Sequence, residues 1–132
     1  MDLELISIAA NTDNNRNIEK KTHVSKLKNS LCGDEMKIEL IMKNKKILDF
    51  GYQGKSCIYC QASASLLSKI SINNQKEEIN NLCDNAELYF DDKVKINDKK
   101  WISLKKLFKK ENVNKKDCIL LPFKTLKKIV ST

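Results

Sequence analysis

A possible metal-ligand set stands out among the reactive side chains of this sequence. It consists of one carboxylate and three thiols, at Asp34, Cys32, Cys57 and Cys118. Gly33 separates the first two of these residues in the chain, and its conformational freedom would let the backbone bring Cys32 and Asp34 to one point. Three thiolates and one carboxylate suit iron or zinc. Taken singly, each cysteine is also compatible with a buried core thiol, so only the combination indicates a metal.

Two of these cysteines are expected at helix N-termini. Cys57 follows a glycine-containing break and precedes an apolar pattern with helical spacing, and Cys118 opens the last predicted helix. The helix dipole and the free N–H groups at such positions favour a thiolate. Lys55 and Lys115 would add positive charge nearby. A small hydrophobic side chain at the start of a core helix would explain both cysteines as well, and this alternative stays open.

A rival set of cysteines would give a structural zinc site. Cys57 and Cys60 form a CxxC sequence, and Cys32 and Cys83 could complete four cysteine ligands. The spacing matches such sites poorly. Cys60 would lie one turn along a helix full of core residues and Cys83 at an apolar position of another helix, so both are interpreted as buried thiols. The function implied by the rival set is a partner-binding zinc module.

Composition limits the classes of function. The 132 residues, 41% of them hydrophobic, predict one domain over residues 1–132. No apolar run is long enough to cross a bilayer and no signal peptide is recognised, so the default location is the cytosol. In that reducing compartment five cysteines indicate thiols or metal ligands. The single histidine, His23, argues against a Cys-His-acid hydrolytic site, and no redox active site is evident.

The net charge of +8 raises the possibility of nucleic-acid binding. The lysines are spread along the chain, however, with a single arginine, Arg16, and only 6% aromatic residues. Neither guanidinium forks for guanine nor an aromatic stacking platform is present. We therefore expect no nucleic-acid partner.

The elements that would position these residues follow from periodicity. A period-two pattern predicts strands at residues 36–42 and 48–53, joined by a hairpin that contains Asn44. A weaker strand is expected at 22–28. Helices are expected at residues 3–9, 57–70, 75–90, 101–108 and 118–130, the last starting properly near Pro122, with polar links at 11–17, 91–100 and 111–116. This order predicts an α+β fold: a small antiparallel three-stranded sheet with helices packed on one face.

The sequence resembles the IscU, SufU and NifU N-terminal family of iron-sulfur scaffold proteins from about Leu27 to Lys128. The residues that carry the resemblance are Cys32-Gly33-Asp34 before an alternating strand, the run Gly54-Lys55-Ser56-Cys57 leading into a helix rich in small residues, and Cys118 before a terminal helix. The resemblance implies a SufE/NifU-like fold. It also implies that Cys32, Asp34, Cys57 and Cys118 bind a nascent [2Fe-2S] cluster, or zinc in its place.

The resemblance further implies a sequence of partners. A cysteine desulfurase would deliver persulfide sulfur to Cys57 or Cys118, iron would bind, and the cluster would pass to apo-proteins. Cys118 follows Cys57 by 61 positions, an interval more similar to the SufU branch than to IscU. The IscU chaperone motif Leu-Pro-Pro-Val-Lys is absent, and Asp117 stands where IscU has a histidine. A zinc-dependent, SufU-type sulfur acceptor therefore remains the alternative, and Lys115 resembles a basic position that would shield or compete for the metal.

Overall fold

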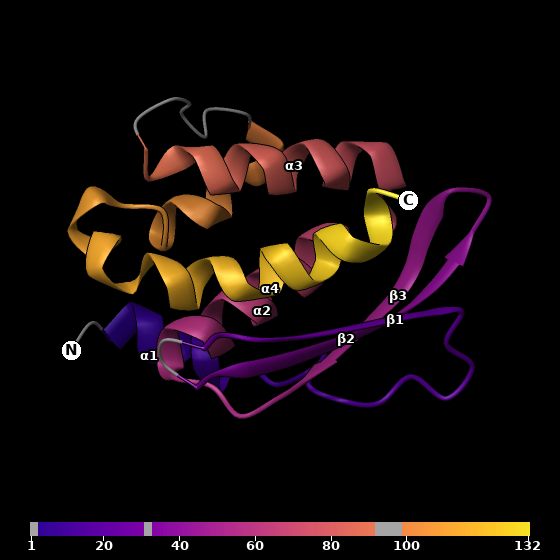
Figure 1. Cartoon of the computed structure of the whole chain (residues 1–132), viewed down its shortest axis with the longest axis horizontal. Coiled ribbons are helices and arrows are strands. Elements are labelled where there is room, and N and C mark those ends of the chain that lie inside the picture. Colours follow the sequence, from indigo (N-terminus) through magenta and orange to yellow (C-terminus); the bar gives the residue numbers. More distant parts are fainter. Residues whose placement is uncertain (1–2, 31–32, 92–98) are drawn as a thin grey trace.

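The structure, a computed structural model, describes residues 3–30, 33–91 and 99–132. In these residues a three-stranded antiparallel sheet of order β1-β2-β3 is combined with helices (Figure 1). Its strands are β1 (His23–Lys28), β2 (Glu35–Lys43) and β3 (Lys46–Gln53). The helices are α1 (Leu3–Ala10), α2 (Ile58–Ser71), α3 (Lys76–Tyr89) and α4 (Lys116–Val130), with the 3₁₀ segments η1 (Lys99–Lys106) and η2 (Lys110–Lys115). The predicted α+β class is confirmed.

The strands form because their side chains alternate between a buried and a more polar face. In β2, Met36, Ile38 and Leu40 are completely buried, as expected for a strand with one face on the core. The hairpin between β2 and β3 turns at Asn44 and Lys45, whose φ angles of 55° and 63° fit the left-handed two-residue turn that matches strand twist. The predicted hairpin is confirmed, and the weakly patterned β1 pairs with β2 along its full length.

The helices cover one face of the sheet in two layers. Helix α4 packs on β1 and β2, α2 packs on β3 and on α4, and α3 packs on the other side of α4 (Figure 1). The small residues of α2 are largely buried, and this helix packs on β3. Two of its serines also bind neighbouring segments through hydrogen bonds. The hydroxyl of Ser63 donates to the carbonyl of Ile119 in α4 at 2.6 Å, and the hydroxyl of Ser65 donates to the carbonyl of Asn11 after α1 at 3.0 Å.

The segment between α1 and β1 is bound to the sheet by the buried carboxylate of Glu39 in β2. Oε1 of Glu39 accepts the N–H of Ile18 at 3.0 Å, and Oε2 lies 3.0 Å from the ammonium of Lys21. Burial opposes the charged form of Glu39, but the N–H of Ile18 and the ammonium of Lys21 together outweigh it and lower its pKa. Glu39 therefore fixes a polar segment that has no regular structure of its own.

Two predicted boundaries are wrong. Helix α4 begins at Lys116 rather than near Pro122, which lies inside the helix. The proline has no N–H to donate to the carbonyl of Cys118, but the strongly apolar face of α4 is buried along its length, and packing outweighs that loss.

The expected polar link at 111–116 contains the 3₁₀ segment η2. Most of the expected loop at 91–100 lies outside the described residues. None of the described helices is long and apolar enough to cross a membrane.

Candidate metal centre

The turn that precedes β2 places Asp34. Gly33 has a φ of 78°, in the left-handed region that glycine adopts without strain. Its N–H donates to the carbonyl of Asn29 at 2.8 Å, and the N–H of Asn29 donates to the carbonyl of Asp34 at 2.7 Å. The turn is thus closed by two backbone hydrogen bonds, and Asp34 is left buried, with 9% of its surface exposed.

A close backbone contact brings Cys57 to this turn. The carbonyl oxygen of Glu35 lies only 2.0 Å from where a Cβ on Gly54 would sit, so only glycine fits there. The N–H of Glu35 donates to the carbonyl of Lys55 at 2.8 Å, which ties the end of β3 to the start of β2. Two residues later, Cys57 is the N-cap of α2, and its N–H donates to Oδ2 of Asp34 at 3.4 Å. The predicted helix N-terminus at Cys57 is therefore present.

Helix α4 supplies the third side chain. Cys118 lies in its first turn and is 8% exposed. The bond from Ser63 to the carbonyl of Ile119 fixes this turn against α2, one residue after the thiol. Cys118 thus approaches the first turn of α2 from a segment far along the chain.

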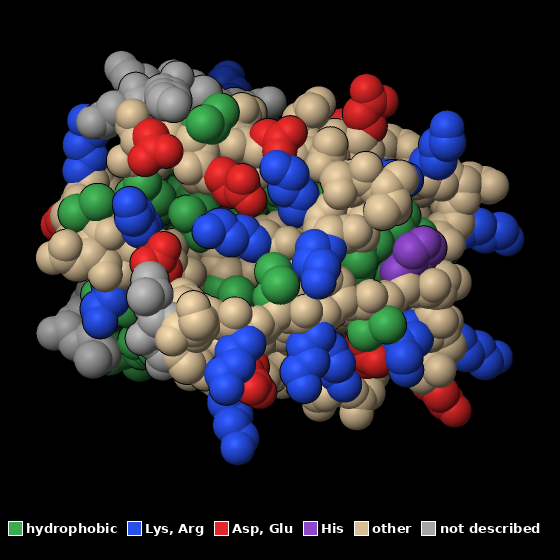
Figure 2. Space-filling view, in the orientation of Figure 1, with side chains coloured by type: hydrophobic (Ala, Val, Ile, Leu, Met, Phe, Trp, Pro, Cys, Tyr) green, Lys and Arg blue, Asp and Glu red, His purple; other side chains and the backbone are tan. Residues whose placement is uncertain are grey.

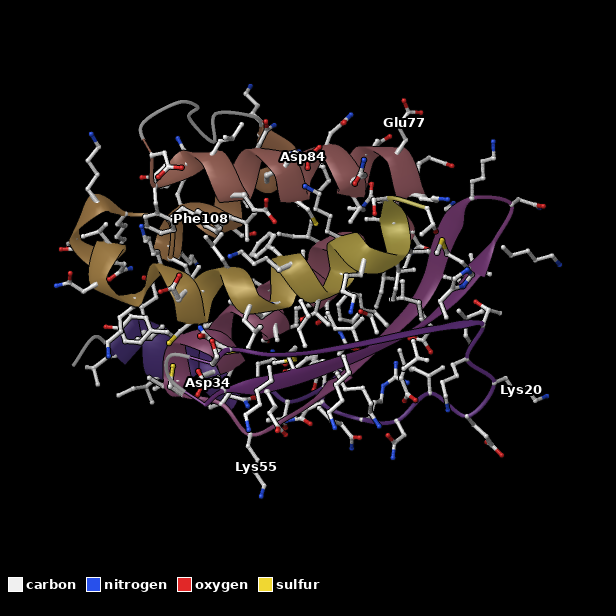
Figure 3. The ribbon with its side chains drawn as sticks, in the orientation of Figure 1. Lys20, Asp34, Lys55, Glu77, Asp84 and Phe108 are labelled. Atoms are coloured by element: carbon white, nitrogen blue, oxygen red, sulfur yellow. The ribbon has the colours of Figure 1, made fainter. Side chains whose placement is uncertain are left out.

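The three side chains meet. The Sγ atoms of Cys57 and Cys118 and a carboxylate oxygen of Asp34 all lie within 4.8 Å of one another. In Figure 3, Asp34 lies beside sulfur atoms near the N-terminal end of α2. Two soft thiols with one carboxylate are ligands that iron and zinc accept. Cys32, the fourth predicted ligand, lies outside the described residues.

The cysteines of the rival zinc set lie elsewhere. Cys60 and Cys83 are completely buried, and neither belongs to the ligand group that the described residues form. Burial raises the pKa of the Cys83 thiol, which disfavours the thiolate that a metal needs. Their interpretation as core thiols agrees with these positions. His23 begins β1, opposite Leu40, whereas Asp34 precedes the other end of β2, so the single histidine is remote from the thiols.

The two lysines that were expected to influence the thiols differ in where they point. The side chain of Lys55 extends away from the protein body in Figure 3 rather than toward Asp34. The ammonium of Lys115 lies over the ring of Tyr59, 5.8 Å from its centre. Tyr59 follows Cys57 by two residues, and nothing in its local pattern had marked it as a neighbour of Lys115.

Residues 4–99 of the sequence match the family described as the NifU-like N terminal domain. The chain belongs to this family. Asp34 and Cys57 lie within the matched region, whereas Cys118 lies beyond it and is brought to the site by the packing of α4. The NifU-like match thus agrees with the resemblance found in the sequence, and the structure brings Cys118, which that resemblance also named, to Asp34 and Cys57.

Individual relatives agree with the NifU-like assignment. The iron-sulfur cluster assembly scaffold protein IscU of Thermotoga maritima is 34% identical over 70 residues, which are 53% of this chain and 49% of that protein. Among solved structures, FiSufU from the SUF system of Fervidobacterium islandicum AW-1 has a TM-score of 0.85 and 25% identity, covering 96% of this chain and 93% of that one. A nitrogen-fixing NifU-like protein (N-terminal) from Brucella abortus has a TM-score of 0.87 at 16% identity, covering 98% and 91%. The chain has the NifU-like fold.

Proposed function

We propose that this NifU-like protein is a scaffold for iron-sulfur cluster assembly. It would accept sulfur from a cysteine desulfurase, bind iron, and build a transient [2Fe-2S] cluster for transfer to apo-proteins. The observation that carries the proposal is the meeting of Asp34, Cys57 and Cys118 within 4.8 Å. Cys32 is the proposed fourth ligand, because it directly precedes Gly33 and Asp34 in the sequence.

Sulfur would enter by exchange between sulfur atoms. A thiolate of the scaffold attacks the outer sulfur of the desulfurase persulfide, a new S–S bond forms as the old one breaks, and the desulfurase cysteine leaves as a thiolate. Of the two candidate ligand thiols that the structure describes, Cys57 at the N-terminus of α2 is the more exposed, and Cys118 is buried. Both thiols lie at a helix N-terminus, so the greater exposure of Cys57 is what favours it over Cys118 as the acceptor.

Asp34 is proposed to keep the site labile. A carboxylate is a harder ligand than a thiolate and binds the iron of a cluster less firmly. A scaffold must release what it assembles, so one weak ligand among three strong ones suits transfer better than four cysteines would.

A second candidate is a zinc-dependent sulfur acceptor with the same residues. Tetrahedral zinc holds its ligand atoms about 3.3–3.8 Å apart, as follows from bond lengths of roughly 2.0–2.3 Å. Three ligand atoms within 4.8 Å of one another are compatible with such a single ion after small adjustments. In this alternative Cys32, Asp34, Cys57 and Cys118 would hold zinc, which would keep the thiols together as thiolates, and one cysteine freed from the metal when the desulfurase docks would attack the persulfide.

One experiment separates the two candidates. The protein is purified anaerobically, its metal content is measured, and it is then incubated with iron, cysteine, a reductant and a cysteine desulfurase. Visible absorbance of a [2Fe-2S] cluster that passes to an apo-ferredoxin supports the scaffold. Tightly held zinc, stimulation of the desulfurase and no cluster absorbance would reject the scaffold in favour of the zinc-dependent acceptor. Neither metal binding nor sulfur transfer would reject both.

A further inference from the structure

Two lysines on the face of the sheet opposite the helices gather with a third that follows β3. Lys26, Lys37 and Lys55, here called the lysine patch, line one hollow of about 320 Å³ together with Glu35, Gln53 and Gly54. In Figure 2, basic side chains follow the margin where Figure 1 places the strands, and Figure 3 shows Lys55 extending from that margin.

The strand register sets two of these lysines side by side. Lys26 of β1 lies directly opposite Lys37 of β2. Their chain neighbours Leu27 and Met36 form the adjacent pair and belong to the core side, so the lysines share the other face. Like charges in directly opposed positions destabilise a sheet. Folding alone therefore gives no reason for this pair.

Acidic side chains do not neutralise the lysine patch. The carboxylate of Glu35, the acidic residue of the hollow, lies 3.8 Å from the ammonium of Lys28 instead. Lys37 donates to the amide oxygen of Asn17 at 3.4 Å, which carries no charge. Within the described part of the chain, Lys26 and Lys55 form no ion pair. Lys37 also lies near enough to Glu39 to help lower the pKa of that carboxyl, but Glu39 pairs with Lys21. Because Glu35 and Glu39 are each paired with a lysine outside the patch, the patch keeps a net positive charge.

The lysine patch adjoins the candidate metal centre. Glu35, whose N–H donates to the carbonyl of Lys55, directly follows the ligand Asp34. Cys57 follows Lys55 by two residues. The patch and the ligands are therefore built on one junction between β2 and the end of β3, and a protein seated on the patch is held next to the thiols.

We infer that the lysine patch is the docking surface for an acidic surface of the sulfur-donor protein, an inference that rests on the proposed function. Opposite charges on two protein surfaces accelerate the encounter of the two proteins and fix their relative orientation. A protein partner fits better than a nucleic acid, because the patch has no arginine and no aromatic residue for reading or stacking bases. The destabilising lysine pair is then retained because it recognises the partner.

The test compares two variants with the same change in net charge. The patch variant is Lys26→Gln, Lys37→Gln and Lys55→Gln; the control variant is Lys20→Gln, Lys69→Gln and Lys124→Gln, three exposed lysines outside the patch. The probe is the purified cysteine desulfurase of the same organism, titrated at low and high ionic strength. Thermal unfolding and zinc uptake are measured in parallel.

We expect the patch variant to bind the desulfurase about tenfold more weakly at low salt than the wild type. The control variant should bind like the wild type, and high salt should weaken wild-type binding toward that of the patch variant. Zinc uptake should not change, and the midpoint of thermal unfolding of the patch variant should be equal or higher, because the opposed lysines have been removed.

Other outcomes separate the inference from the proposed function. If the wild type and both variants bind the desulfurase equally, the inference is wrong and the proposed function stands. If the patch variant also loses zinc, the lysines position the centre rather than dock a partner, which overturns the inference. Patch-dependent binding of a DNA oligonucleotide without any desulfurase binding would assign the surface to nucleic acid. Failure of the wild type to bind the desulfurase at all would reject the sulfur-acceptance step, and the inference with it.

Discussion

Asp34 accepts the backbone N–H of Cys57 at 3.4 Å, so a carboxylate from the turn before β2 lies at the N-terminus of α2. The partial positive charge of a helix N-terminus attracts a carboxylate. Asp34 therefore has a partner within the protein before any metal arrives. An ion at the proposed site would compete with the helix for the same side chain, and this competition adds a physical reason for weak ligation by Asp34.

Asp34→Ala is expected to lengthen the lifetime of a reconstituted cluster and to slow its transfer. The exchangeable ligand is removed, and the proposed thiolate ligands remain. The N–H of Cys57 loses its acceptor, so we also expect a loss of about 1 kcal/mol in the free energy of unfolding. The decay of visible absorbance in the presence of a chelator measures the lifetime. Asp117→Ala, which removes an exposed carboxylate next to Cys118, is the matched control; equal lifetimes in the two variants would contradict the role of Asp34.

Cysteine substitutions distinguish the proposed ligand set from the rival one. Cys57→Ser and Cys118→Ser should each lose most of the bound zinc per chain, measured by a colorimetric chelator assay after gel filtration. Cys60→Ala and Cys83→Ala should keep the metal and lose about 1 kcal/mol of stability through the small cavities left in the core. The opposite pattern, with zinc lost in Cys60→Ala or Cys83→Ala and retained in Cys118→Ser, would support the structural zinc module.

Gly54→Ala should disrupt the junction between β3 and α2. Its Cβ would lie 2.0 Å from the carbonyl oxygen of Glu35, so the backbone must move, at a cost of roughly 3 kcal/mol. We expect weaker zinc binding as well, because this contact leads the chain to Cys57. Gly33→Ala has open space around the new methyl and only an unfavourable φ, which costs about 1 kcal/mol. Urea unfolding compares the two, and equal costs would show that the contact at Gly54 is not tight.

Glu39 should make stability depend on pH in the acid range. Its pKa in the folded protein lies below the ordinary value of 4.5, so it contributes stability that is fully present above that value. This contribution is lost as pH falls from about 4.5 through the lowered pKa. Glu39→Gln keeps an acceptor for Ile18 but loses the charge that pairs with Lys21, so we expect about 1 kcal/mol lower stability at neutral pH. Urea unfolding at several pH values should give a flatter acid profile for the variant; identical profiles would contradict this role.

Much of the fold could be predicted because one-sided burial leaves a period in the sequence. Met36, Ile38 and Leu40 repeat every second residue, and the hairpin turns at Asn44 and Lys45 as the polar run between the strands indicated. The start of α4 could not be predicted in this way. A proline is a strong local signal against a helix interior, and only the tertiary packing of the apolar face on the sheet and on α2 overrides it.

Three of the four predicted ligands lie together in the described part of the chain, but how the fold brings them together could not be predicted. The residue types and the helix N-termini pointed to Asp34, Cys57 and Cys118, and these side chains meet. The Gly54 contact lies between segments that are separated in the chain, so no local pattern could indicate it. Lys55 follows this contact by one residue, and its side chain lines the hollow of the lysine patch and extends away from Asp34.

The three side chains that meet at the candidate centre come from three separate segments: the turn before β2, the start of α2 and the first turn of α4. An ion bound by all three would act as a cross-link between distant parts of the chain. Binding to the folded form alone raises the free energy of unfolding in proportion to the logarithm of the free metal concentration. Metal binding would therefore make the chain more resistant to unfolding and proteolysis, and release of the metal would return the chain to a less stable form. Proteolysis in a cell would then remove the metal-free protein faster than the metal-bound protein.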